Sequence, residues 1–275
     1  MAELSETLGS DSLILAGGMM VQVYAAMLKE KYGKESMLIT RKTVDVDFLV
    51  DLMAKGAHVD PVVRKLSGIG FEIQEPAFHN GVFYRMLRDD GELNLLIADH
   101  LPSRKRAMAK YNHWPLFQTD GGAQAISRAM MLDAVYRDRT FSVQVPDLLG
   151  ALVLKSAAYG ADGRNGERHL YDICVLLALI DAPKELLYRV HGSDKKRLLT
   201  SLRALAEEDI YGWMMFEDNI IEQINDSIHA LKNGLENGEY GSSAQSIAAR
   251  KQEEARILNE VSKLEIPKEH QPPTI

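Results

Sequence analysis

Apolar and polar positions alternate with two different periods in the first half of the chain, which predicts a mixture of strands and helices. Apolar residues at helical spacing follow Gly17 and Gly18 and predict a helix that ends near Gly33. Residues 37–51 predict a strand region, and residues 59–71 predict a short helix with a glycine-rich exit. This part of the chain therefore indicates an α/β structure.

Two further runs predict strands before the pattern changes. Residues 81–99 form two alternating segments joined at Arg88–Gly91, which is typical of a β-hairpin with a tight turn. Residues 141–146 predict one more strand, which ends at Pro146. Helical periodicity then dominates, and the predicted helices lie at residues 146–160, 167–180, 195–208, 218–234 and 243–266.

The change in periodicity near residue 146 predicts a boundary between two parts. We expect a mixed α/β domain at residues 1–145, a helical domain at 146–266 and a disordered tail at 267–275. A chain of 275 residues with 46% hydrophobic content is long enough for such an arrangement.

Composition narrows the class of protein. The net charge of −7 argues against a protein that coats nucleic acid non-specifically, although a local basic groove remains compatible with it. The single cysteine, Cys174, cannot form an internal disulfide, and no apolar stretch is long enough to span a membrane. The acidic, polar N-terminus is unlike a signal peptide, so we expect a cytoplasmic protein.

Two carboxylates on the predicted strand carry the first functional signal. Asp45 and Asp47 alternate with apolar residues, so their side chains share one face of the strand and repel each other. A solvated strand face is the simpler interpretation. The alternative is a Mg²⁺ site, because Gly17-Gly18 opens a helix whose N-terminus attracts phosphate, and paired carboxylates are hard oxygen ligands.

Three segments together resemble a known group. They are LAGGMMVQVY, RKTVDVDFLV and the helical pair LLGALVLKSAAY and RHLYDICVLL, which span roughly residues 13–180. Their order is similar to that in the polymerase-β-like nucleotidyltransferase superfamily, and most similar to the AbiEii/MenT nucleotidyltransferase toxins of bacterial toxin–antitoxin systems. The resemblance implies a mixed sheet flanked by helices and followed by a helical bundle that completes the active site. It also implies an NTP substrate, Mg²⁺, a tRNA acceptor, a block of translation and a cognate antitoxin.

The resemblance implies roles for further residues. Asp45 and Asp47 would hold Mg²⁺, and Gly17, Gly18, Arg41, Thr43 and Arg168 would contact the nucleotide. Lys155 would neutralise the leaving pyrophosphate, or it is a lysine that extends to the surface from a helix edge. Asp172 would position Lys155 or the nucleotide, and either Lys155 or Arg168, which precedes it by four residues, could be its partner.

The expected third carboxylate is missing. Members of the superfamily often carry an acidic residue on a following strand, and here the aligned position is Asn94. Glu92 shares its face by alternation, whereas Asp99 falls on the other face. Either a displaced carboxylate acts as general base, or the metal alone activates the acceptor hydroxyl.

The acceptor is the least constrained part of the hypothesis. Residues 102–111 concentrate basic side chains, which form either a solvated helix face or a docking patch for RNA with Tyr111, His113 and Trp114 available for stacking. Two rival functions remain: a nucleotidyltransferase that modifies a small molecule or a protein, and a catalytically silent nucleotide-binding module of the same fold.

Overall fold

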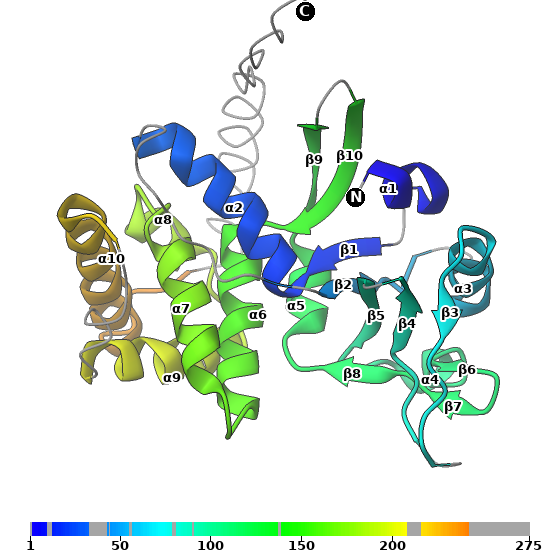
Figure 1. Ribbon diagram of the computed structural model, residues 1–275. Helices are drawn as coiled ribbons and strands as arrows, with labels where there is room; N and C mark the ends of the chain where they lie inside the picture. The colour runs from blue at the N-terminus through cyan, green and yellow to red at the C-terminus, as the bar shows by residue number, and fades with distance from the viewer. Residues whose placement is uncertain are drawn as a thin grey trace, which may run out of the picture.

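A mixed β-sheet forms the centre of the protein, and helices gather on one side of it in the second half of the chain (Figure 1). The computed structural model describes residues 2–9, 13–32, 43, 45–54, 57–78, 81–89, 91–136, 139–207 and 216–241. The central sheet has eight strands among these residues. Seven of them follow the order β3-β4-β5-β2-β1-β10-β9, and the eighth, β8, pairs with β5. The strands are β1 (Leu13–Ala16), β2 (Asp45–Val50), β3 (Glu72–Ile73), β4 (Arg85–Arg88), β5 (Gly91–Ala98), β8 (Phe117–Thr119), β9 (Ala129–Tyr136) and β10 (Arg139–Pro146), and a separate hairpin pairs β6 (Lys110–Tyr111) with β7 (Trp114–Pro115).

The strand that carries the two aspartates lies in the middle of this sheet. β2 runs parallel to β5 on one side and antiparallel to β1 on the other. Its second half, Phe48–Val50, is buried, as expected for a central strand covered on both faces. Only its first half, from Asp45 to Asp47, is partly open, so the carboxylates lie where the strand emerges from the core.

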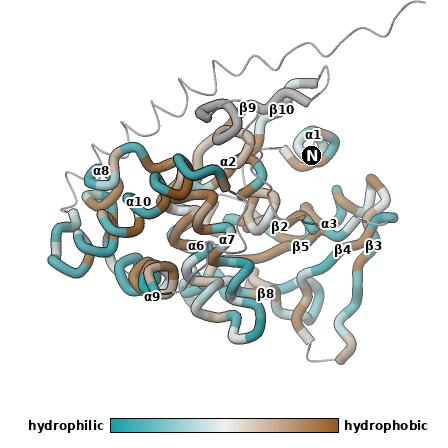
Figure 2. The backbone as a smooth tube through the Cα atoms, turned by 60° about the vertical axis from the view of Figure 1, so that its left-hand side comes forward, coloured by the Kyte–Doolittle hydropathy of each residue, from teal (hydrophilic) through white to brown (hydrophobic). Residues whose placement is uncertain are grey.

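The helices follow the predicted pattern closely. The helix after the glycine pair ends at Tyr32, and the helices predicted at 59–71, 146–160, 167–180, 195–208 and 218–234 are all present. Much of β5 and α6 is brown, that is hydrophobic, in Figure 2, in agreement with the burial of these elements. The described helices are α1 (Ala2–Leu8), α2 (Gly17–Tyr32), α3 (Val59–Gly68), α4 (Ser103–Arg106), α5 (Gly122–Ser127), α6 (Leu148–Ala161), α7 (Gly166–Leu177), α8 (Pro183–Tyr188), α9 (Asp194–Glu207) and α10 (Asp218–Glu236).

The transition from sheet to helices is fixed by buried polar contacts. Asp147 caps α6 by accepting a hydrogen bond from the Gly150 backbone N–H at 2.8 Å. The same carboxylate forms a buried ion pair with Arg189, which follows α8. A second buried pair joins Arg128, just before β9, to Asp194 at the start of α9 at 2.5 Å. These contacts hold the end of the sheet and three helices in one arrangement.

The expected fold class is confirmed: a mixed sheet flanked by helices is followed by a helical part. The division at residue 146 into two domains stays a prediction. The predicted helix at 243–266 and the tail at 267–275 lie outside the described residues. Across the part of the chain that the structure describes, every helix is too short or too polar to cross a membrane.

Candidate active site

The end of β1 and the start of α2 bring the glycine pair against the strand that carries the aspartates. β1 is antiparallel to β2, with Ala16 opposite Asp47, so the chain enters α2 beside that carboxylate. Gly17 has a φ of 62°, and a Cβ at this position would lie 1.7 Å from Asp47 Oδ2. A Cβ on Gly18 would lie 2.9 Å from Thr43 Oγ1. Glycine is therefore needed here for its backbone conformation and for the close approach of strand and helix.

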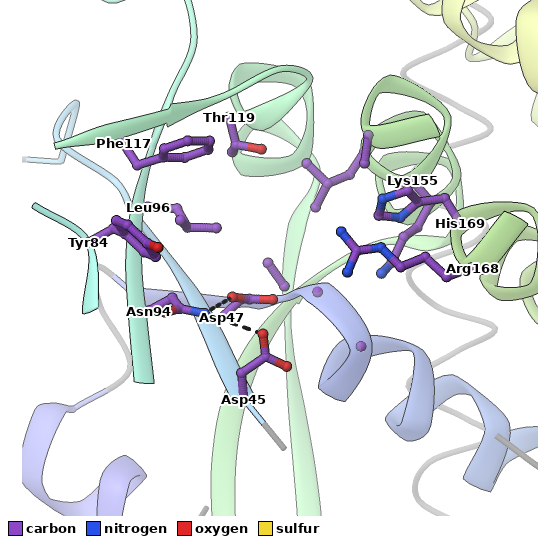
Figure 3. A pocket seen from close by; sticks show the side chains of 15 residues that line it. Asp45, Asp47, Tyr84, Asn94, Leu96, Phe117, Thr119, Lys155, Arg168 and His169 are labelled. Carbon is purple, nitrogen blue, oxygen red and sulfur yellow. Dashed lines mark hydrogen bonds between the residues drawn. The ribbon is translucent and has the colours of Figure 1, made fainter. Parts of the chain in front are cut away.

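The two carboxylates are held together by neutral donors. β2 and β5 are parallel, with Asp47 opposite Asn94, and Asn94 Nδ2 donates to Asp47 Oδ1 at 2.8 Å and to Asp45 Oδ2 at 3.4 Å (Figure 3). Arg85 Nε donates to Asn94 Oδ1 at 3.2 Å, so the amide must turn its NH₂ group toward the carboxylates. Thr43 Oγ1 donates to Asp45 Oδ1 at 2.6 Å. Within the described part of the chain, uncharged donors therefore order the carboxylate pair.

The pKa of Asp47 is perturbed mainly by burial. Burial raises the pKa of Asp47 above its ordinary value, and the neighbouring Asp45 carboxylate raises it further. The hydrogen bond from Asn94 and the more distant charges of Lys155 and Arg168 oppose this shift without cancelling it. A carboxylate in this condition gains stability when a cation binds next to it.

Lys155 faces the aspartates from α6 and is oriented by a buried partner. Its Nζ donates to Asp172 Oδ2, on α7, at 2.7 Å, and both residues are almost fully buried. Of the two partners considered for Asp172, the structure therefore selects Lys155. The i,i+4 pair with Arg168 does not form in this way, because Arg168 Nη2 donates instead to Asp162 Oδ2 at 2.9 Å. A buried ammonium with one fixed partner retains two donors for another group.

His169 is a residue whose position the sequence did not indicate. No motif singles out this histidine, yet it is buried on α7 and lines the same cleft as Lys155 and Arg168. Burial lowers its pKa to about 4, and the nearby Lys155 and Arg168 charges act in the same direction. Its imidazole is therefore neutral at pH 7.

A cleft of about 330 Å³ joins these groups. The Lys155, Arg168 and His169 side chains form one wall, and Tyr84 and Phe117 form the opposite wall (Figure 3). The carboxylates and the glycine pair lie between them. The lining residues are Ala16, Gly17, Gly18, Asp45, Asp47, Tyr84, Asn94, Leu96, Phe117, Thr119, Leu154, Lys155, Ala158, Arg168 and His169.

Most of the residues that the sequence singled out lie in or next to this cleft. The cleft is lined by Gly17, Gly18, Asp45, Asp47, Lys155 and Arg168. Thr43 and Asp172 lie behind the lining, where they form hydrogen bonds with Asp45 and Lys155, respectively. Arg41 lies outside the described residues. The roles assigned to these residues stay predictions.

The two displaced carboxylates do not take the place of the missing third one. Glu92 forms an ion pair with Arg85 at 3.0 Å. Asp99 is buried and accepts hydrogen bonds from the backbone of Gly121 and Ala123 and from Arg197 at 2.8 Å. Neither lines the cleft. Asn94 thus occupies the position beside Asp47, as the alignment of the strands predicted.

The donor set at the carboxylates fits Mg²⁺. Mg²⁺ is usually bound through one or two carboxylates together with substrate phosphates and water, and Asp45 and Asp47 supply the first part of such a set. Asp47 has a raised pKa, and among the residues that the structure describes its hydrogen-bond donor is the neutral amide of Asn94, so a divalent ion would stabilise its charge. Within the described residues no group of three or more His, Cys, Asp or Glu side chains forms a protein-only metal site. Water and a phosphate-bearing substrate are the ligands that usually complete such a site.

Comparison with known proteins gives limited guidance. No family model and no curated protein matches the chain. A crystal structure of an antigenic nucleotidyltransferase-like protein from Paracoccidioides brasiliensis is similar to it at 15% identity and a TM-score of 0.45. The similarity covers 82% of this chain and 88% of that one.

Proposed function

We propose that this protein is a Mg²⁺-dependent nucleotidyltransferase, which transfers a nucleotide from an NTP to an acceptor hydroxyl. The observation that carries this proposal is the cleft in which Asp45 and Asp47 lie beside Gly17 at the N-terminus of α2 and face Lys155. Carboxylates for a metal, an open helix N-terminus and a cation converge there, and a nucleoside triphosphate with Mg²⁺ has the charges that match all three.

Different residues of the cleft would bind the metal, bind the phosphates and stabilise the leaving group. Asp45 and Asp47 would hold Mg²⁺, and the bound ion would supply positive charge against the phosphates and polarise the phosphorus under attack. The glycines leave the backbone N–H groups at the start of α2 open to phosphate oxygens. Lys155, held by Asp172, would stabilise the charge that develops on the leaving pyrophosphate.

Three other residues contribute to binding or order. Arg168 provides a second cation, and its planar guanidinium suits phosphate oxygens. Thr43 orders the Asp45 carboxylate through its hydroxyl. Asn94 is a neutral amide that cannot take a proton, so it orders the carboxylates and does not act as general base.

For the acceptor we propose tRNA, and for the biological role a toxin that blocks translation in the cytoplasm and is neutralised by a cognate antitoxin. The resemblance of the three segments to AbiEii/MenT toxins supports this finer proposal. Its test is incubation with total tRNA, Mg²⁺ and each labelled NTP in turn, with Asp47→Ala as the paired variant. Labelled tRNA with the wild type and none with Asp47→Ala is the expected result.

Asn94 favours one second candidate, a nucleotide-binding module without catalysis. An amide in place of a carboxylate removes one anionic metal ligand, which weakens the case for catalysis but leaves the phosphate contacts intact. This candidate predicts nucleotide binding without labelled product for any acceptor, and no relief of growth inhibition by Asp45→Ala. The labelling assay with a parallel binding measurement separates the two functions.

A further inference from the structure

The cleft wall opposite Lys155 is aromatic. Tyr84 and Phe117 lie with their ring centroids 5.8 Å apart and their planes at 54°, and both line the cleft (Figure 3). Phe117 is 47% exposed, which is unusual for a phenylalanine on a strand of the central sheet. A single exposed hydrophobic residue needs no explanation, but a pair of rings beside the two carboxylates does.

Backbone hydrogen bonds tie the residues that carry both rings to the sheet. The Leu95 backbone N–H donates to the Tyr84 carbonyl at 2.6 Å, and the Phe117 N–H donates to the Phe83 carbonyl at 3.2 Å. Phe117 also lies opposite Leu96 in the pairing of β8 with β5. The strand that places Asn94 beside the aspartates therefore also fixes the distance of the rings from them.

The cations of the cleft are on the other wall. Lys155 and Arg168 lie on α6 and α7, whereas the guanidinium of Arg85 lies beside the rings, 5.3 Å from the Tyr84 ring centroid. Arg85 is already engaged with Glu92 at 3.0 Å and with Asn94. Phosphate groups are therefore attracted to the helical wall, and the aromatic wall suits a flat, uncharged ring.

The geometry of phosphoryl transfer assigns the two walls to different substrates. The attacking and leaving oxygens lie roughly in line on opposite sides of the phosphorus. Pyrophosphate that leaves toward Gly18 and Lys155 requires an acceptor that enters from the side of Asn94, Tyr84 and Phe117. The aromatic wall is then next to the attacking hydroxyl.

We infer that Tyr84 and Phe117 stack on the base of the terminal nucleotide of an RNA acceptor, and this inference rests on the proposed nucleotidyltransferase function. Aromatic rings bind unstacked bases with little sequence preference, and neither a serine or threonine hydroxyl nor an aminoglycoside offers such a flat face. The exposed basic side chains of Arg104 and Lys110 lie in the segment that leads through β6 and β7 into β8. They supply positive charge for the RNA backbone beyond the rings.

This assignment replaces the stacking residues suggested by the sequence. Trp114 is buried, and its ring centroid lies 4.4 Å from that of His113. Tyr111 is half-buried, and its ring centroid lies 5.0 Å from that of Phe83. The burial of Trp114 therefore does not suit the stacking role that the sequence left open for it. The exposed π-surface lies instead at Phe117.

The test measures RNA and nucleotide affinity separately in Phe117→Ala and Tyr84→Ala. Fluorescence anisotropy reports tRNA binding in Mg²⁺, and a fluorescent NTP reports donor binding. Loss of one stacking partner weakens tRNA binding roughly 5- to 150-fold and leaves the NTP dissociation constant within about twofold. Phe117→Tyr keeps the ring and retains affinity, whereas Phe117→Leu keeps the apolar area without the ring and does not.

Phe78→Ala is the matched control, because Phe78 is 79% exposed and does not line the cleft. It leaves both affinities unchanged. Denaturant unfolding of each variant checks that Tyr84→Ala is folded, and Phe117→Ala provides the result if it is not.

Other results are equally decisive. Weaker NTP binding with unchanged tRNA binding assigns the rings to the donor base and overturns the inference. Unchanged affinities for both substrates also overturn it. If the wild type binds NTP with Mg²⁺ but none of tRNA, a single-stranded RNA oligonucleotide or its DNA counterpart, the inference fails and nucleotidyl transfer stands. If it binds no NTP with Mg²⁺, the proposed function fails first. Preference for the RNA oligonucleotide over DNA supports the RNA assignment, and the reverse preference contradicts it.

Discussion

Alanine at position 17 would change both the backbone and the carboxylate site, and the two effects can be separated. Gly17 has a φ of 62°, a conformation that costs a non-glycine residue about 1–2 kcal/mol. In addition, the new Cβ would lie 1.7 Å from Asp47 Oδ2, where contacts shorter than 3.0 Å essentially never occur. The carboxylate must therefore move by more than an ångström.

Gly192→Ala is the control for the backbone effect, because Gly192 has a φ of 57° and open space around its Cβ position. We expect both variants to lose a similar ~1–2 kcal/mol of unfolding free energy in urea, with a further loss in Gly17→Ala from the displaced side chain. Only Gly17→Ala should lose affinity for NTP with Mg²⁺, because the displaced carboxylate no longer holds the metal, and its transfer rate should fall by about 100-fold, since an ångström of misplacement has effects of that size on catalysis. Equal affinities of the two variants in isothermal titration calorimetry would refute the reasoning.

Three further predictions concern the same cleft. Lys155→Met should lower the unfolding free energy by about 3–5 kcal/mol, because it removes one partner of a buried ion pair. Adding Asp172→Leu should restore most of the stability but no transfer activity; restored activity would show a purely structural pair. Asn94→Asp should bind Mg²⁺ about tenfold more tightly through the added negative charge, as measured by titration calorimetry, and unchanged affinity would place the metal elsewhere. The pKa of His169 is lowered to about 4, so the unfolded chain binds more protons between pH 4 and 6.5; stability should fall by up to about 1.4 kcal/mol per pH unit as the pH drops through this range. His169→Gln should flatten that part of the pH profile of urea unfolding, and an unaltered slope would contradict the assignment.

Local signals were sufficient for the hairpin of β4 and β5 and for the helices α2, α3, α6, α7, α9 and α10, whereas the short helices α1, α5 and α8 were not predicted. Helical spacing, a cap at Asp147 and a glycine turn act over a few residues, so the sequence records them directly. β9 was not predicted, because Ala129–Tyr136 is mostly apolar without alternation and gains its structure from pairing with β10. β1 is only four residues long and becomes a strand through its distant partners β2 and β10.

The same distinction explains what the sequence revealed of the site. The spacing of Asp45 and Asp47 on one strand fixes their common face, and the order of segments indicated their closeness to Gly17. The aromatic wall could not be anticipated, because Tyr84 and Phe117 meet only through the separate pairing of their backbones with the sheet. Equally, the burial of Trp114 follows from tertiary packing that composition does not encode.

Titration of each of the four NTPs, as non-hydrolysable analogues, into wild type and Asp47→Asn tests the central claim most directly. The account predicts binding to the wild type that requires Mg²⁺ and disappears in EDTA, and clearly weaker affinity in Asp47→Asn, which keeps the shape of the side chain but removes the negative charge that binds the metal. Binding that is independent of Mg²⁺, or equally tight in Asp47→Asn, would contradict it.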